Sequence, residues 1–208
     1  TGVTVVMSQY YGAKEEDKVV KTFFSSIFIA LGMTILVTVI GLLTTRPLLI
    51  VLQTPAEVLD AAVLYLRIIC AGSVGTMLYN WISAVLRSLG NSVVPLIFLG
   101  ISSLLNIVFD ILFVAVIPMG VGGAAFATVL AQIISGVACL LYAWKILPML
   151  RIRRDKLKLD TYIGKQMLVY GLPAALQMSI ISISDMTLQA VVNTYGTTLV
   201  VAYGVCIK

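Results

Sequence analysis

The sequence predicts an all-α protein whose helices cross a membrane several times. Of its 208 residues, 60% are hydrophobic and only 11% are charged, whereas soluble domains carry about 25% charged and about 45–50% apolar residues. Long uncharged segments alternate with short polar loops along the chain. The chain is too long for a single span and has too little charge to cover a surface that faces water. We therefore expect a polytopic transmembrane helical bundle.

The distribution of positive charge argues against nucleic acid as a partner and predicts an orientation in the membrane. The net charge is +5, but the 14 Lys and Arg residues lie in short loops and do not follow one exposed face. Eleven of them lie in loops 14–21, 87–92 and 145–165, and the alternate loops hold Arg46 alone. An excess of Lys and Arg marks cytoplasmic loops. We expect these three loops to be cytoplasmic, and the protein to be integral to the cytoplasmic (plasma) membrane.

The first sixty residues predict a partial span, a complete span and a surface segment. Residues 1–13 carry no charge and close with Gly12-Ala13, as expected for the last turns of a span. Thr22 to Thr45 comprises 24 uncharged residues, enough to cross about 30 Å of hydrocarbon at about 1.5 Å per residue. Arg46-Pro47 and the segment to Asp60 predict a turn and a short helix at the opposite surface.

The next span is expected from about Ala61 to Leu86, with Arg67 near its outer end, where its long side chain can reach the headgroups. Polar residues recur along one side of this span at Thr76, Asn80, Ser83 and Arg87. They could line a cavity or bond to neighbouring helices, and the sequence leaves both interpretations open.

One acidic residue stands out in residues 92–145. Asp110 is the only charged residue between Arg87 and Lys145. A turn at 90–92 predicts a helix that ends near Ile117, and on it Ser102, Asn106 and Asp110 fall at i, i+4 and i+8. An ionised Asp near the centre of a span costs roughly 2.5–3.5 kcal/mol, so such residues usually have a function. The alternative is that Asp110 only bonds neighbouring helices.

A partner helix is expected from about Gly123 to Trp144. It begins with small residues, which let helix backbones approach closely, and Thr128 and Gln132 form its polar face. A short turn at 118–123 makes the two helices antiparallel neighbours. Thr128 is therefore expected to face the stripe of Ser102, Asn106 and Asp110.

The last part of the chain predicts a basic loop, a complete span and the start of another. Residues 145–165 carry seven Lys or Arg residues, and a span follows from about Gln166 to Val192, with a kink at Gly171-Leu172-Pro173. Its polar groups again form one stripe: Gln177, Asp185, Gln189 and Asn193. Because both ends of the sequence lie within apolar runs, we expect a fragment with five complete spans and two partial ones.

Residue types that carry much of enzyme and metal chemistry are scarce. The chain has no His, and its three Cys are widely spaced within apolar runs: Cys70, Cys139 and Cys206. This pattern indicates neither a disulfide framework nor a metal site, and the cysteines are expected to be small buried residues. No Gly-x-Ser-x-Gly motif is present. An intramembrane enzyme is therefore a remote alternative, and we expect no cofactor.

An ordered set of short motifs resembles the multidrug and toxic compound extrusion (MATE) family of cation-coupled exporters, from the second helix to the start of the eighth in a twelve-helix pattern. The motifs are Ser8-Gln9 with Gly12-Ala13-Lys14; Tyr65-Leu66-Arg67-Ile68; Arg87, Gly90, Pro95, Asn106-Ile107 and Asp110; Gly120-Val121, Gly123-Ala124-Ala125, Ala127-Thr128 and Gln132; Gly171-Leu172-Pro173 with Leu176-Gln177; and Gly196 with Ala202-Tyr203. No single motif is diagnostic, but their order and spacing are specific.

The resemblance implies part of a two-bundle (6+6) transporter. Residues 1–147 would be the first six-helix bundle without helix 1 and part of helix 2, residues 148–165 a cytoplasmic linker, and residues 166–208 the start of the second bundle. The implied activity is an antiporter that exchanges H⁺ or Na⁺ for amphipathic, mostly cationic organic compounds. Membrane lipid and the remainder of the parent chain are the other expected partners.

The resemblance also implies which residues bind the coupling ion. Asn106, Asp110 and Thr128 match three positions of an ion site in the first bundle, whose fourth member is an Asp on the helix before Thr1. Asp185 resembles an acid of the second bundle only loosely. The possible cavity-lining residues are Asn80, Ser102, Gln132, Gln177, Asp185 and Gln189. No metal other than Na⁺ at Asp110 is expected.

Two further functions are alternatives to an exporter. A related flippase for lipid-linked saccharides would need several cationic residues facing its cavity, whereas only Arg67 and Lys208 lie within apolar runs here. A purely structural membrane subunit would have no need of Asp110.

Overall fold

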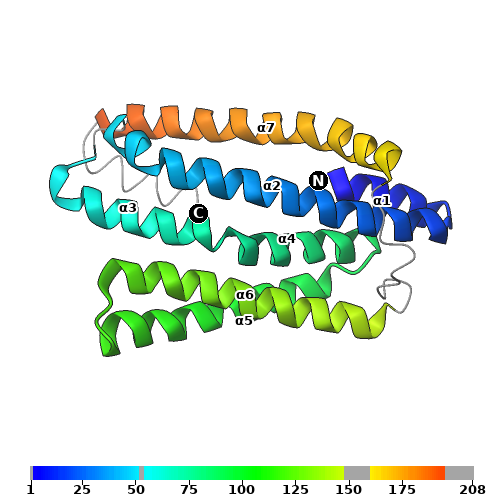
Figure 1. The fold of residues 1–208 in the computed structure, drawn as a ribbon, viewed down its shortest axis with the longest axis horizontal. Helices are drawn as coiled ribbons and strands as arrows, with labels where there is room; N and C mark the ends of the chain where they lie inside the picture. The colour runs from blue at the N-terminus through cyan, green and yellow to red at the C-terminus, as the bar shows by residue number, and fades with distance from the viewer. Residues whose placement is uncertain (1, 52–53, 148–159, 195–208) are drawn as a thin grey trace.

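The computed structural model describes residues 2–51, 54–147 and 160–194, and every element in these ranges is a helix. The helices lie side by side in an elongated bundle (Figure 1). In chain order they are α1 (Gly2–Gly12), α2 (Glu16–Val51), α3 (Ala56–Ala71), α4 (Ser73–Ser88), α5 (Val93–Asp110), the π-helical η1 (Ile111–Val116), α6 (Gly120–Ile146) and α7 (Thr161–Thr194).

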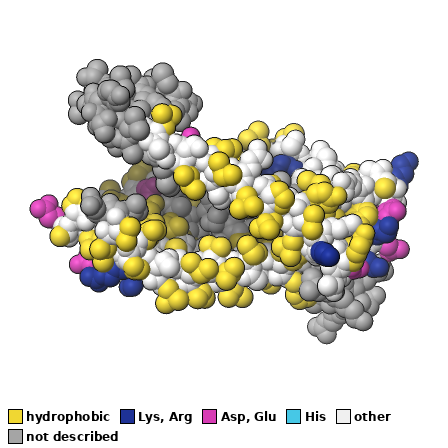
Figure 2. Space-filling view, turned by 90° about the horizontal axis from the view of Figure 1, so that it is seen from above, with side chains coloured by type: hydrophobic (Ala, Val, Ile, Leu, Met, Phe, Trp, Pro, Cys, Tyr) yellow, Lys and Arg dark blue, Asp and Glu magenta, His cyan; other side chains and the backbone are white. Residues whose placement is uncertain are grey.

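The described helices match the expectation of a polytopic membrane protein. Four are long and apolar enough to cross a bilayer, namely α2, α5 with η1, α6 and α7, and the bent pair α3 and α4 makes a fifth. Large apolar side chains cover the outside of these helices, while Lys, Arg, Asp and Glu gather mostly toward the two ends of the molecule (Figure 2). The five complete spans expected from the sequence are all present.

The connections alternate between the two ends of the bundle as the charge pattern requires. The α1–α2 and α4–α5 turns lie at one end with the close of α6 and the start of α7, and the α2–α3 and α5–α6 turns lie at the other end (Figure 1). The three loops expected to be cytoplasmic therefore begin on one side. Most of the basic loop, residues 148–159, and the final apolar run lie outside the described residues.

The prediction of a turn and a short surface helix between Arg46 and Asp60 is wrong. Helix α2 continues through Pro47 to Val51, and residues 56–60 already belong to α3. In the turn before the proline, the Thr44 and Thr45 hydroxyls donate to the carbonyl oxygens of Ile40 and Gly41. Hydroxyl groups of this kind help spanning helices to accommodate a proline.

The span expected from Ala61 to Leu86 is broken in the structure. Helices α3 and α4 meet at Gly72 with a bend of 45°. A Cβ atom on Gly72 would lie 2.2 Å from a methyl group of Val129 on α6. The bend thus lies where the Val129 side chain of α6 packs directly against the backbone between α3 and α4.

The last helix begins earlier than expected, at Thr161 instead of Gln166. The Asp160 carboxylate accepts hydrogen bonds from the backbone N–H groups of Tyr162 and Ile163, at 3.1 and 3.2 Å. This is the geometry of an N-cap, which satisfies backbone donors at the start of a helix. The Asp160 N–H donates to the buried Ser25 hydroxyl on α2 at 2.9 Å, so the start of α7 is attached to the first helices.

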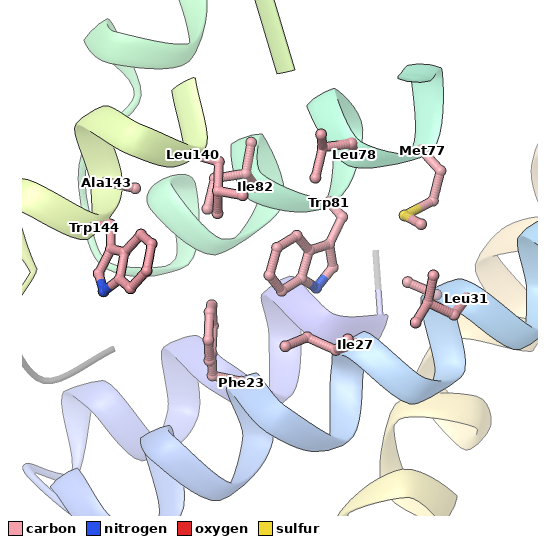
Figure 3. Close-up of a pocket in the computed structure, with 11 residues that line it drawn as sticks. Phe23, Ile27, Leu31, Met77, Leu78, Trp81, Ile82, Leu140, Ala143 and Trp144 are labelled. Atoms are coloured by element: carbon pink, nitrogen blue, oxygen red, sulfur yellow. The ribbon is translucent and has the colours of Figure 1, made fainter. Parts of the chain in front are cut away.

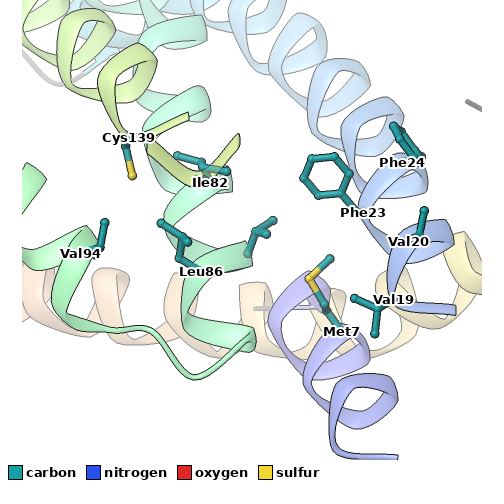
Figure 4. Packing of buried hydrophobic residues seen from close by; sticks show 11 residues of the cluster. Met7, Val19, Val20, Phe23, Phe24, Ile82, Leu86, Val94 and Cys139 are labelled. Carbon is teal, nitrogen blue, oxygen red and sulfur yellow. The ribbon is translucent and has the colours of Figure 1, made fainter. Parts of the chain in front are cut away.

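The packed core lies in the half of the bundle near the α1–α2 and α4–α5 turns (Figure 4). It joins α1, α2, α4, α5 and α6 through Met7, Val19, Val20, Phe23, Phe24, Ile82, Val85, Leu86, Val94, Cys139 and Ala143. The expectation that cysteines are small buried residues holds for Cys139, whereas Cys70 is half-buried and Cys206 lies outside the described residues. Toward the other end, α2 is mostly exposed.

Candidate functional site

The α5–α6 hairpin brings two of the predicted ion-site residues into contact. The Asn106 side-chain amide on α5 donates to the Thr128 hydroxyl on α6 at 3.3 Å. The same hydroxyl donates to the carbonyl oxygen of Ala124 at 3.1 Å, one turn earlier on α6. The expected meeting of Thr128 with the polar stripe of α5 is therefore observed, and the bond to Ala124 holds the hydroxyl in place to receive the amide.

Asp110 lies one helical turn beyond Asn106 on the same face of α5. Its side chain is half-buried, and its Oδ1 atom is fully buried with no hydrogen-bond partner among the described residues. A buried polar atom without a partner is costly, and a buried charge is costlier still. Among the described residues of the hairpin, Asp110 is the one acid, and one of its oxygen atoms lacks a partner there.

The helix changes its geometry directly after Asp110. Residues Ile111–Val116 form a π-helix, and the Ile117 N–H donates to the carbonyl oxygen of Leu112. Short π-helical segments occur frequently at functional sites. Rings of Phe109, Phe113 and Phe126 pack beside this segment, with centroid distances of 5.8 and 5.4 Å for the two successive pairs.

A second polar pair is expected one turn toward the start of α5. Because α5 and α6 are antiparallel and Asn106 contacts Thr128, the turn with Ser102 stands opposite the turn with Gln132. Ser102 is buried, and the Gln132 Oε1 atom is buried without a partner among the described residues. The structure thus extends the polar face of the hairpin over two turns on α6.

The other predicted cavity-lining residues lie elsewhere. Asn80 is exposed on α4 and donates to the carbonyl oxygen of Thr76 in its own helix. Gln177 and Asp185 are exposed on α7, which packs on α1 and α2 and does not contact α5 or α6 within the described residues. The side chain of Gln189 lies outside the described part of the chain. Of the members of this group whose side chains are described, only Ser102 and Gln132 therefore lie beside the Asn106–Thr128 pair.

The donor set suits a monovalent ion better than a transition metal. The described residues contain no group of three or more His, Cys, Asp or Glu side chains that could hold a metal ion. One carboxylate with amide and hydroxyl oxygens nearby offers only hard oxygen ligands.

Sequence reasoning missed a polar contact that joins α4 to α2. Trp81 donates from its indole nitrogen to the Ser26 hydroxyl on α2 at 2.9 Å. In the sequence both residues resemble their apolar and hydroxyl-bearing neighbours, and only the packing of α2 on α4 pairs them.

Comparison with known proteins identifies the family. The MatE family model matches residues 1–112, more than half of the chain. The chain belongs to the multidrug and toxic compound extrusion (MATE) family. Among curated relatives, the probable multidrug resistance protein YpnP of Bacillus subtilis is 35% identical over 96% of this chain and 44% of its own length. The probable multidrug resistance protein NorM of Thermotoga maritima is 28% identical over 87% of this chain and 40% of its own.

A solved transporter of the MOP superfamily from Pyrococcus furiosus shares the fold. It superposes with a TM-score of 0.86 at 24% identity, over 98% of this chain and 45% of that chain. The chain spans less than half the length of the curated relatives it matches. The all-α transmembrane architecture expected from the sequence is confirmed by these similarities.

Proposed function

We propose that the protein acts in a secondary active exporter, an antiporter of the cytoplasmic membrane that couples entry of H⁺ or Na⁺ to efflux of amphipathic organic cations. The observation that carries the proposal is the buried Oδ1 of Asp110, which has no partner among the described residues and lies one turn from the Asn106–Thr128 pair. The names of the curated relatives, which are probable multidrug resistance proteins, support efflux as the direction of transport.

The proposed cycle follows from the cost of an ionised carboxylate in the bundle. Asp110 takes up the cation from outside, with Thr128 and Asn106 supplying oxygen atoms or hydrogen bonds. Neutralising the charge removes the penalty of burying it, so the helices around it can pack differently. That change in packing expels the substrate and turns the cavity inward, as alternating access requires. The glycines and prolines at 118–123 and 171–173 are the proposed flexing points.

A flippase for lipid-linked saccharides is the second candidate function. A diphosphate group calls for several cationic side chains around the cavity. Within the described helices, Arg67 is exposed on α3 and Arg46 lies near an acid, 3.9 Å from Asp60. Within the described residues, no hydrogen bond or ion pair joins either arginine to Asn106, Asp110 or Thr128, which favours the exporter.

The substitution Asp110→Asn in the full-length protein tests the exporter. It keeps the size of the side chain but removes its negative charge. Binding of a cation can then no longer switch this position from charged to neutral. We expect efflux driven by an imposed H⁺ or Na⁺ gradient in proteoliposomes to fall to the level of vesicles without protein. Asp60→Asn is the matched control, because that carboxylate is 87% exposed. Full efflux by folded Asp110→Asn protein would rule out the proposed coupling.

A further inference from the structure

A narrow apolar groove lies between α2, α4 and α6 (Figure 3). Its volume is about 240 Å³. Side chains from all three helices form its walls, among them Phe23, Leu31, Met77, Trp81, Leu140 and Trp144.

The groove opens toward the outside of the described helices, since its lining residues Leu31 and Trp144 are 42% and 46% exposed. Every residue that lines it is apolar, and on α4 Met77 and Trp81 lie about 100° around the helix axis from Thr76 and Asn80, respectively. A side of a spanning helix without polar groups is the side that meets lipid or another apolar helix. The groove therefore belongs to the outer face of the bundle and not to the candidate ion site.

Hydrogen bonds hold the groove in a fixed shape. The Trp81 indole donates to the Ser26 hydroxyl at 2.9 Å, and that hydroxyl donates to the carbonyl oxygen of Phe23 at 2.7 Å. The Phe23 and Trp81 rings lie 5.1 Å apart. Because the indole N–H already has an acceptor, Trp81 presents only apolar surface to an occupant.

The dimensions of the groove exclude a drug-sized ligand and a helix as its occupant. Its volume of about 240 Å³ is below the roughly 300–1,000 Å³ of pockets for drug-sized ligands. A helix, about 10 Å across with its side chains, is also too wide for it. From Phe23 to Leu31 the α2 wall rises by about 12 Å, close to one half of the roughly 30 Å hydrocarbon layer.

The end of the groove near Trp144 marks the level of the membrane interface. Trp144 directly precedes the exposed Lys145, two residues before the end of α6 at Ile146. Trp residues are enriched at membrane interfaces, and Lys residues mark the cytoplasmic one. The groove thus runs from that interface toward the middle of the bilayer.

We propose that the groove is a binding site for one acyl chain of a phospholipid from the leaflet on the side of Lys145. The chain lies between α2 and α6 against Trp81, and Trp144 covers it near the headgroup. An acyl chain has the length, width and apolarity that the walls require. The bound lipid fills the space between α2 and α6, whose backbones do not pack directly on each other within the described residues.

The two tryptophans of this chain, Trp81 and Trp144, both line the groove and can report its occupancy. The experiment uses the full-length protein in detergent, with any tryptophan outside this segment replaced by phenylalanine. Phosphatidylglycerol with brominated acyl chains is added, because bromine quenches tryptophan fluorescence on contact. We expect quenching that saturates at a low ratio of lipid to protein.

Two aromatic substitutions on α2 provide the decisive comparison. Ala30→Phe fills the groove, and we expect the saturable quenching to be lost. Ile35→Phe adds an aromatic ring at a position that is 64% exposed, and quenching should persist. If Ala30→Phe lowers the yield of folded protein, Leu140→Phe fills the groove from α6. Quenching that rises without saturation, or that survives filling of the groove, would leave only ordinary surrounding lipid and overturn the proposal.

Discussion

Asp110, Asn106 and Thr128 show how much a residue pattern can predict within an apolar helix. The spacing of Ser102, Asn106 and Asp110 placed them on one face, and the antiparallel hairpin predicted that Thr128 would meet that face. The structure confirms the contact between Asn106 and Thr128. It also shows that Thr128 bonds to Asn106 and Ala124 and not to Asp110, which spacing alone did not indicate.

The hydroxyl of Thr128 offers a test at the scale of single residues. We expect Thr128→Val to lower gradient-driven efflux by up to about tenfold, because a neutral hydrogen bond contributes about 0.5–1.5 kcal/mol and Asn106 loses its acceptor. Thr128→Ser keeps the hydroxyl and should restore efflux. Initial rates in proteoliposomes measure the effect.

Thr44→Val is the matched control for this substitution, because the exposed Thr44 hydroxyl bonds only within α2. Equal losses in both valine variants would show that the effect does not depend on the contact with Asn106.

Helices α2, α3 and α4 show that the ends and bends of helices could not all be predicted from the sequence. Proline usually interrupts a helix, so Arg46-Pro47 predicted a turn, yet α2 runs on for four residues beyond Pro47 to Val51. The opposite happens at Gly72, where an unbroken apolar run contains a 45° bend. Whether a helix continues or bends depends on which backbone groups form hydrogen bonds and on which side chains of neighbouring helices contact its backbone. Both are properties of the packed bundle.

The bend at Gly72 leads to a prediction about stability. We expect Gly72→Ala to destabilise the protein by about 1–3 kcal/mol, the usual cost of overpacking, because the new methyl group would overlap the Val129 side chain. Thermal unfolding in detergent measures the loss.

Two further variants separate crowding from helix propensity. Gly72→Ala combined with Val129→Ala should recover part of the lost stability, since it removes the two methyl groups at 2.2 and 2.4 Å and leaves only the Cβ of residue 129 at 2.9 Å from the new methyl group. Gly100→Ala on α5 has no neighbour within 4 Å and should not destabilise. If the double variant is no more stable than Gly72→Ala alone, the contact with Val129 is not the cause of the lost stability.

At the scale of the whole molecule, the alternation of charged loops predicts the orientation. The α4–α5 turn and the α5–α6 turn lie at opposite ends of the bundle (Figure 1). We expect a cysteine at Ser92 to react with a membrane-impermeant thiol reagent only from the cytoplasmic side, and one at Met119 only from outside. Both positions are exposed, and the native cysteines are replaced by alanine beforehand.

Labelling in intact cells and in inverted vesicles distinguishes the two sides. Reaction of both cysteines from the same side would contradict the arrangement of five spans, whereas exchange of the two sides would reverse the orientation inferred from Lys and Arg.

The sequence by itself determined the all-α membrane architecture, the five complete spans and the face of α5 that carries Asp110. These depend on apolar run length and helical periodicity, which are local properties of the chain. The tertiary structure decided the bend at Gly72, the continuation of α2 through Pro47, the partners of Thr128 and the groove beside Trp81. Each of these depends on which side chains of distant helices meet, and the energy of such contacts arises only when the helices pack together.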